Sequence, residues 1–158
     1  MSSETPVVAV YQPGLLEVGW TGVICMTNNS YIVKYPKASS GHNTYNKIHL
    51  EQMVTERQIY ECLSPHEGII PYDKPYDDEG VIRLTYTNQC DLEKYIPAHN
   101  MPSQSFCAAW VRSLINTFYH IYTHKALHQD VKLNNIFIYH NCVKITDFAA
   151  LPMVLSSH

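Results

Sequence analysis

The 158-residue chain lacks an excess of basic charge, long hydrophobic runs, and repeated or low-complexity tracts. Its 11 Lys and Arg stand against 14 Asp and Glu, which gives a formal net charge of -3 and a pI near 6.3. We therefore expect no nucleic acid partner, because the basic footprint of such proteins is missing. We also expect no membrane partner, since no apolar run approaches the ~18 residues of a spanning helix. The 46% hydrophobic and 16% charged residues are typical of one globular domain.

A secretion signal and a disulfide framework are missing as well. The N-terminus, MSSETPVVAV, contains Glu4 and has no positive region before an apolar core, so we predict no secretory signal. Five cysteines form no C-x-x-C pair, and their odd number leaves one unmatched. Reduced thiols are the simpler interpretation, which favours a cytoplasmic or nuclear location.

What the chain does contain is a polar segment near its C-terminus, HQDVKLNNIFIYHNCVKITDF, from His128 to Phe148. Asp130, Lys132 and Asn135 lie on one predicted loop, and two apolar strands follow before Asp147. A hairpin of these strands would bring Asn135 and Asp147 to neighbouring ends. That spacing suits metal ions held against a phosphate chain; a solvated loop with scattered carboxylates is the alternative.

The segment resembles the catalytic core of eukaryotic protein kinases, whose motifs are H-R-D-L-x-x-x-N and D-F-G. The corresponding sequences here are H-Q-D-V-K-L-N-N and D-F-A. The resemblance implies ATP and Mg²⁺ as cofactors, with Asp130 as the base that accepts the substrate hydroxyl proton. It further implies that Asn135 and Asp147 bind the magnesium ions. Lys132 is similar to the lysine of serine/threonine-type loops.

Two substitutions and the chain's end depart from the family pattern. Gln129 replaces the arginine that would bind an activation-loop phosphate, and Ala149 replaces a glycine and restrains the backbone after Asp147. The chain stops at His158, before the family's activation segment and later helices. We therefore expect a truncated α+β kinase-like domain over residues 1–158. Its N-lobe, an antiparallel sheet with one helix, and the hinge would span about 14–87, and an incomplete helical C-lobe would span 88–158.

The resemblance also implies a lysine on a strand and a glutamate on a helix. The β-branched run Tyr31–Lys34 is similar to the family's V-A-I-K strand and is ended by Pro36, and Lys34 would reach the nucleotide phosphates. In a predicted helix over 49–63, Glu56 falls with three large side chains inside an arc of about 80°. Because a carboxylate in an apolar face is costly unless paired, we expect Glu56 to pair with Lys34. The alternative is an amphipathic helix with Glu56 at the edge of its stripe.

The predicted phosphate loop has fewer glycines than the family motif. Gly19, Gly22 and Val23 are its candidate nucleotide contacts, and Trp20 near the tip would hinder closure. An ordinary β-turn between strands over 15–18 and 23–26 is an equally good interpretation.

The nucleotide base would lie between two bulky side chains. Ile32 stands where the family commonly has alanine above the adenine ring, and Phe137 occupies the strand position below it. Two further strands are predicted over 68–72 and 80–86, with Leu84 beside the pocket. Residues 85–89, including Thr85 and Thr87, would form the hinge.

A long helix is predicted after Pro102, because five apolar residues fall within about 120° of its surface: Phe106, Trp110, Leu114, Phe118 and Ile121. We expect this stripe to face the core. His120, His124 and His128 recur at a helical spacing that would suit a metal site. The better interpretation is that His128 packs in the core.

Three functions follow from these patterns. The first is a protein kinase that transfers the γ-phosphoryl group of ATP to a protein serine or threonine hydroxyl. The second is an inactive pseudokinase, or fragment, that binds a partner protein. The third is a small-molecule phosphotransferase of the aminoglycoside or choline kinase type, against which Lys132 argues.

Overall fold

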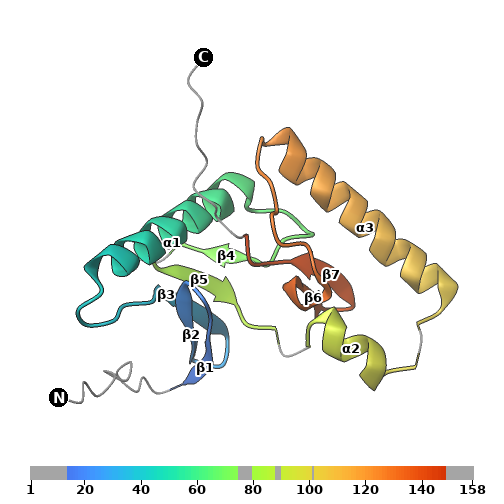
Figure 1. Ribbon diagram of the computed structural model, residues 1–158. Helices are drawn as coiled ribbons and strands as arrows, with labels where there is room; N and C mark the ends of the chain where they lie inside the picture. Colours follow the sequence, from blue (N-terminus) through green and yellow to red (C-terminus); the bar gives the residue numbers. More distant parts are fainter. Residues whose placement is uncertain (1–13, 75–79, 88–89, 101, 149–158) are drawn as a thin grey trace.

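The computed structural model describes residues 14–74, 80–87, 90–100 and 102–148. An antiparallel sheet with one long helix forms the N-terminal half, and two helices with a β-hairpin form the C-terminal half (Figure 1). The prediction of a kinase-like α+β fold is confirmed. Ala149 and residues 88–89 of the predicted hinge lie outside the described residues.

The sheet contains five strands in the order β1-β2-β3-β5-β4. Their bounds are β1 Leu15–Val18, β2 Gly22–Thr27, β3 Tyr31–Pro36, β4 Tyr72–Asp73 and β5 Ile82–Thr85. All pairs are antiparallel, and β3 lies between β2 and β5 with Ile32 opposite Leu84. The central position of β3 buries the adjacent Val33 and Lys34 and places Lys34 within the sheet rather than at an edge.

The prediction of a strand over 68–72 is wrong in its bounds. Only Tyr72 and Asp73 join the sheet, as β4. Residues 68–70 instead pair with the C-terminal half: the amide of Ile145 donates to Gly68 O at 2.8 Å, and that of Ile70 donates to Ile145 O at 3.0 Å. This segment therefore joins the sheet to the hairpin.

The long helix α1 spans Asn43–Leu63, so it begins earlier than the predicted 49. Its first turn is exposed and has no apolar periodicity, and the side chain of Asn46 exchanges two hydrogen bonds with the backbone of Ser39. The predicted buried arc is confirmed, because the buried residues are Met53, Glu56, Tyr60 and Leu63. The helix lies against the sheet (Figure 1).

The C-terminal half contains α2 Leu92–Ala98, α3 Gln104–Thr123, a 3-10 turn over Leu133–Asn135, β6 Ile136–Tyr139 and β7 Cys142–Ile145. The hairpin of β6 and β7 is as predicted, with Ile136 opposite Ile145. Helix α2 was not predicted from the sequence; it is short and begins where Asp91 accepts a hydrogen bond from the amide of Lys94. Among the residues that the structure describes, no helix is long and apolar enough to cross a membrane.

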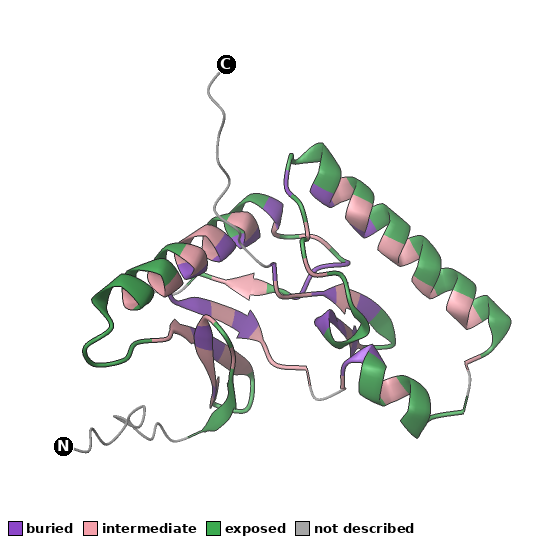
Figure 2. Ribbon diagram, viewed as in Figure 1, coloured by how far each residue is buried: buried purple, intermediate pink, exposed green. Residues whose placement is uncertain are grey.

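The predicted apolar stripe of α3 faces the core but is only partly covered (Figure 2). Ile121 is buried, whereas the other four residues of the stripe are half buried. The opposite side of α3 is exposed and also carries large side chains: Val111, Ile115, Tyr119 and Tyr122. One core cluster nevertheless runs through both halves, from Tyr60 and Leu84 to Ile121, Ile145 and Phe148.

Candidate functional site

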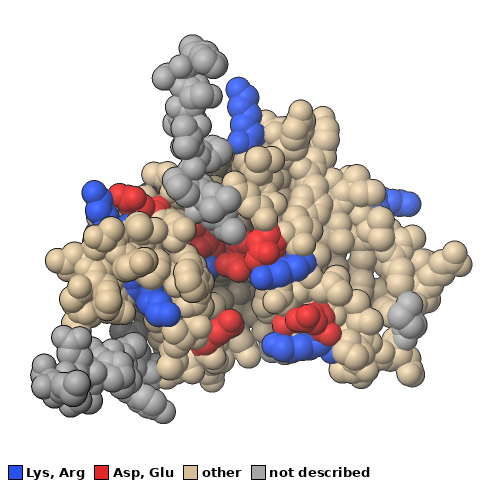
Figure 3. Space-filling view, viewed as in Figure 1, with Lys and Arg blue, Asp and Glu red and all other residues tan. Residues whose placement is uncertain are grey.

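A cleft of about 880 Å³ lies between the sheet and the β6–β7 hairpin. Its lining includes most of the residues predicted from the sequence: Gly19, Gly22, Ile32, Lys34, Glu56, Leu84, Thr85, Thr87, Asp130, Lys132, Asn135, Phe137 and Asp147. Acidic and basic side chains lie next to one another around a hollow in the middle of the face shown in Figure 3. Residues more than 110 positions apart in the sequence, such as Lys34 and Asp147, meet in this cleft.

Lys34 is the centre of the charged network. Its Nζ donates to Glu56 Oε1 at 2.7 Å and Oε2 at 2.9 Å, and to Asp147 Oδ1 at 2.8 Å. Lys34 and Glu56 are both buried, so each charge relies on its partner. Burial alone would lower the pKa of Lys34, but the carboxylates of Glu56 and Asp147 outweigh burial and raise that pKa above its ordinary value. The lysine is therefore a fixed cation at the back of the cleft.

The loop before β6 holds a second group of polar side chains. Lys132 Nζ lies 2.7 Å from Asp130 Oδ2, and Asn135 Nδ2 donates to Asp130 O at 2.9 Å and Oδ2 at 3.1 Å. The hydrogen bond from Lys132 holds the pKa of Asp130 below its ordinary value, and the bond from Asn135 acts in the same direction. Asp130 is therefore an ionised hydrogen-bond acceptor near neutral pH.

The β6–β7 hairpin brings the loop that carries Asp130 and Asn135 next to the segment that carries Asp147. The amide of Thr146 donates to Asn135 O at 3.1 Å, and His128 Nε2 lies 2.8 Å from Thr146 O. Asp147 has a φ of 63°, a left-handed conformation that is uncommon for a residue with a side chain. Its side chain is half exposed toward the cleft, while Phe148 is fully buried.

The apolar part of the cleft contains the predicted Ile32, Leu84 and Phe137. Val23, which was also predicted, does not line the cleft, whereas Ile24 does. Successive side chains of a strand point to opposite faces, so Ile24 and Gly22 share the face toward the cleft and Val23 points away. Leu16 and Ile70 also line it and were missed. Strand alternation from Gly22 was the signal that would have found Ile24.

The predicted phosphate loop is a tight hairpin turn. The amide of Gly19 donates to Gly22 O at 2.8 Å, so this amide is used within the turn. A Cβ on Gly22 would lie 2.8 Å from Tyr35 O, which explains the need for glycine there. Trp20 is 84% exposed at the tip, where it forms part of the rim of the cleft.

The three helically spaced histidines do not form a metal site. His120 Nε2 lies 2.9 Å from Leu63 O, and His128 lies on the loop beyond the helix, with its ring 5.0 Å from that of Phe148. Across the described ranges, no group of three His, Cys, Asp or Glu side chains is arranged to hold a metal ion. The prediction that His128 packs in the core is met only in part, because His128 is half buried at the edge of the core, against the buried Phe148.

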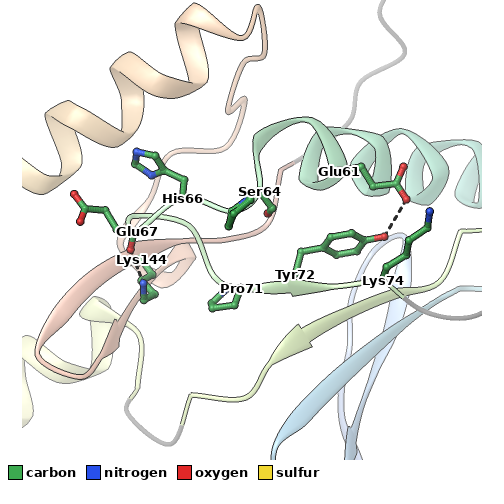
Figure 4. Close-up of a pocket in the computed structure, with 9 residues that line it drawn as sticks. Glu61, Ser64, His66, Glu67, Pro71, Tyr72, Lys74 and Lys144 are labelled. Atoms are coloured by element: carbon green, nitrogen blue, oxygen red, sulfur yellow. Dashed lines mark hydrogen bonds between the residues drawn. The ribbon is translucent and has the colours of Figure 1, made fainter.

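A second, more open pocket of about 720 Å³ lies where the end of α1 approaches β4 and the loop over residues 64–67 (Figure 4). Tyr72 donates to Glu61 Oε1 at 3.0 Å within it, and His66, Lys74 and Lys144 contribute to its wall. Apart from Val23, the predicted site residues line the charged cleft, and none of them lines this pocket.

Comparison with known proteins agrees with the geometry of the cleft. The sequence matches the protein kinase domain over residues 21–154. It is 24% identical over 155 residues to mitogen-activated protein kinase 1 of Oryza sativa subsp. japonica and to mitogen-activated protein kinase 6 of Arabidopsis thaliana, each match covering 90% of this chain. It is also 30% identical over 109 residues, 65% of this chain, to the human NUAK family SNF1-like kinase 1. The alignments span 38%, 38% and 16% of these relatives. Because the family match covers most of the chain and includes the charged cleft, the chain belongs to the protein kinase domain family.

Proposed function

We propose that the cleft binds Mg²⁺ and ATP, and that the kinase domain to which this chain belongs transfers the γ-phosphoryl group to a protein serine or threonine hydroxyl. The observation that carries the proposal is Lys34, buried and bonded to both Glu56 and Asp147 in the cleft that Asp130 and Lys132 also line. This is the charge arrangement that phosphoryl transfer requires, because such catalysis consists mainly of positioning and charge neutralisation. Residues 14–87 would supply the N-lobe and hinge, and 88–158 part of the C-lobe.

The residues present fit a magnesium ion. Asp147 offers a half-exposed carboxylate to the cleft, and Asn135 directs its amide nitrogen to Asp130, which leaves its amide oxygen for a cation. Such hard oxygen ligands are those that Mg²⁺ prefers. When bound, the ion neutralises the charge of the phosphates. Lys34 would hold the phosphates as a second cation, and Ile32, Leu84 and Phe137 would enclose the base.

In the proposed reaction, the substrate hydroxyl oxygen forms a bond to the γ-phosphorus while the bond to the β–γ bridging oxygen breaks and ADP leaves. The hydroxyl proton passes to Asp130. Its lowered pKa keeps this carboxylate ionised, so it orients the hydroxyl before it accepts the proton. Lys132, 2.7 Å from Asp130, would stabilise the transferring phosphoryl group.

Binding is tested by calorimetry and thermal unfolding of the full chain with ATP in Mg²⁺ and with ATP in EDTA. At a concentration of 100 Kd, Mg-ATP should raise the melting temperature by about 5–10 °C. Asp147→Asn should remove most of the effect of Mg²⁺, whereas Glu51→Gln, on the exposed side of α1, should not change it. No shift at millimolar Mg-ATP would exclude nucleotide binding and favour a binding module.

Transfer is tested with γ-labelled ATP and a mixture of unrelated protein substrates, followed by phosphoamino acid analysis. We expect labelled serine or threonine, and loss of labelling with Asp130→Ala. An Asp130→Ala protein with unchanged labelling would contradict the role of this residue as base. Label in small amino-alcohols but not in protein would instead identify a small-molecule phosphotransferase.

A further inference from the structure

The side chain of Tyr60 places a single hydroxyl inside the core between α1 and the end of the hairpin. The residue is 0% exposed and lies one helical turn after Glu56. Its hydroxyl oxygen accepts a hydrogen bond from the amide of Asp147 at 3.0 Å and lies 2.9 Å from Thr146 Oγ1. The two contacts are made to Thr146 and Asp147, the two residues that follow β7.

The ring of Tyr60 is held by its neighbours. It stacks on Tyr72 with 5.9 Å between ring centroids, and Phe148 packs edge-on at 5.0 Å. A buried hydroxyl without a hydrogen-bond partner is costly, so the buried position of the Tyr60 hydroxyl is favourable only while Thr146 and Asp147 are close enough to bond it. The burial of this hydroxyl therefore favours the observed position of Thr146 and Asp147.

That segment carries an uncommon backbone conformation. Asp147 has a φ of 63°, and a non-glycine residue keeps such a conformation only where its surroundings determine it. Two contacts hold Asp147 in this conformation: Lys34 Nζ donates a hydrogen bond to its carboxylate at 2.8 Å, and the Tyr60 hydroxyl accepts one from its amide at 3.0 Å. Glu56 bonds Lys34, so two residues one turn apart on α1 reach Asp147, one through Lys34 and one directly.

We infer that Tyr60 is a positioning residue whose hydroxyl holds the backbone of Asp147 so that its carboxylate faces the cleft. The inference rests on the proposed role of Asp147 as a magnesium ligand. If Tyr60 acts in this way, the position of Asp147 depends on how α1 packs against the sheet, because Tyr60 and Glu56 lie on the same helix and move together. Burial raises the pKa of Tyr60, so at neutral pH the hydroxyl keeps its proton and can donate to Thr146 while it accepts from Asp147.

The decisive variant is Tyr60→Phe, which removes one oxygen atom and keeps the packed ring. Amide hydrogen exchange of Asp147, followed by NMR without nucleotide, should accelerate about fivefold in the full chain, as expected for the loss of one hydrogen bond. Tyr72→Phe is the matched control, because it removes the same atom from the adjacent ring, whose hydroxyl bonds Glu61 at an exposed position. It should leave exchange at Asp147 unchanged.

A second readout separates positioning from a general structural role. The ratio of ATP affinity in Mg²⁺ to that in EDTA should fall at least about threefold in Tyr60→Phe, while affinity in EDTA stays within about twofold. Unchanged exchange and an unchanged ratio would overturn the inference, as would equal losses of affinity in both conditions. If Tyr60→Phe does not fold, the wild-type chain decides, because the hydroxyl of Tyr60 is the acceptor of the Asp147 amide: this amide must exchange more slowly than in an unstructured peptide, and exchange at the unprotected rate refutes the inference. If the wild type binds no Mg-ATP, the proposed function fails, and exchange at Asp147 still tests Tyr60.

Discussion

At the scale of single residues, the cleft depends on charges that are buried together. Lys34 has 7% and Glu56 5% of its surface exposed, and neither would remain ionised at acceptable cost without the other. Glu56 was predictable because its helical phase coincided with three large apolar residues. The bond from Lys34 to Asp147 was not predictable, since no local pattern links a residue on β3 to a residue just beyond β7.

Removal of the lysine should therefore destabilise the fold as well as the site. We expect Lys34→Met to lower the free energy of unfolding by about 3–5 kcal/mol, because Glu56 is left buried without its cation. Urea unfolding measures the change. Lys34→Met combined with Glu56→Met should recover much of the loss, and the exposed Lys47→Met should cost less than about 0.5 kcal/mol. Equal costs for the single and double variants would contradict this account.

At the scale of elements, the sequence predicted those with strong periodicity and missed those fixed by capping or by distant partners. The buried arc of α1 follows from its 3.6-residue period, whereas its first turn is exposed and carries no such signal. Helix α2 is short, and its start is set by the Asp91 cap. Residues 68–70 have strand-like sequence, but only packing decides that their partner is β7 rather than the sheet.

The loop between α1 and β4 contacts α3 through stacked histidines, which predicts a dependence of stability on pH. The ring centroids of His66 and His120 lie 4.1 Å apart, and the ring centroid of His124 lies 4.2 Å from that of His120. The amide of Gly68 donates to His66 Nδ1 at 3.1 Å, which requires that nitrogen to be unprotonated. Burial, and then the charge of His120, lower the pKa of His66; Lys144 and His124 act in the same direction, and Glu67 opposes them.

Because the folded pKa of His66 lies below the unfolded one, its neutral form favours folding. Its contribution is complete above about pH 6.5 and decreases as the pH falls through that value toward the folded pKa. Thermal unfolding between pH 8 and 5 should show this decrease, and His66→Gln should flatten it. His42→Gln, at an exposed position, should leave the slope unchanged. A wild-type slope in His66→Gln would contradict the assignment.

At the scale of the whole molecule, the two halves meet in a close contact around Gly68. A Cβ added there would lie 1.7 Å from Thr117 Oγ1 and 2.8 Å from Thr117 Cβ, on α3. Thr117 is buried, and its hydroxyl donates to Ser113 O at 2.8 Å. The glycine therefore permits α3 to approach the segment that pairs with β7.

Gly68→Ala should lower the free energy of unfolding by about 1–3 kcal/mol, since the contact cannot accept a methyl group without movement of α3. Urea denaturation measures the loss. In a double-mutant cycle, Thr117→Ala should offset part of it, because the nearest atom is removed and two side chains in contact are not independent. Strict additivity of the two substitutions would show that the halves do not meet at this point.

The sequence alone determined the family resemblance, the β6–β7 hairpin, the buried arc of α1 and most of the cleft residues, because motif order and periodicity are local properties of a chain. It did not determine that Ile24 rather than Val23 faces the cleft, that Gly19 uses its amide within the turn, or that Tyr60 bonds Asp147. Those outcomes depend on which segments pack together. Burial then imposes hydrogen-bond and charge partners that lie far apart in the sequence.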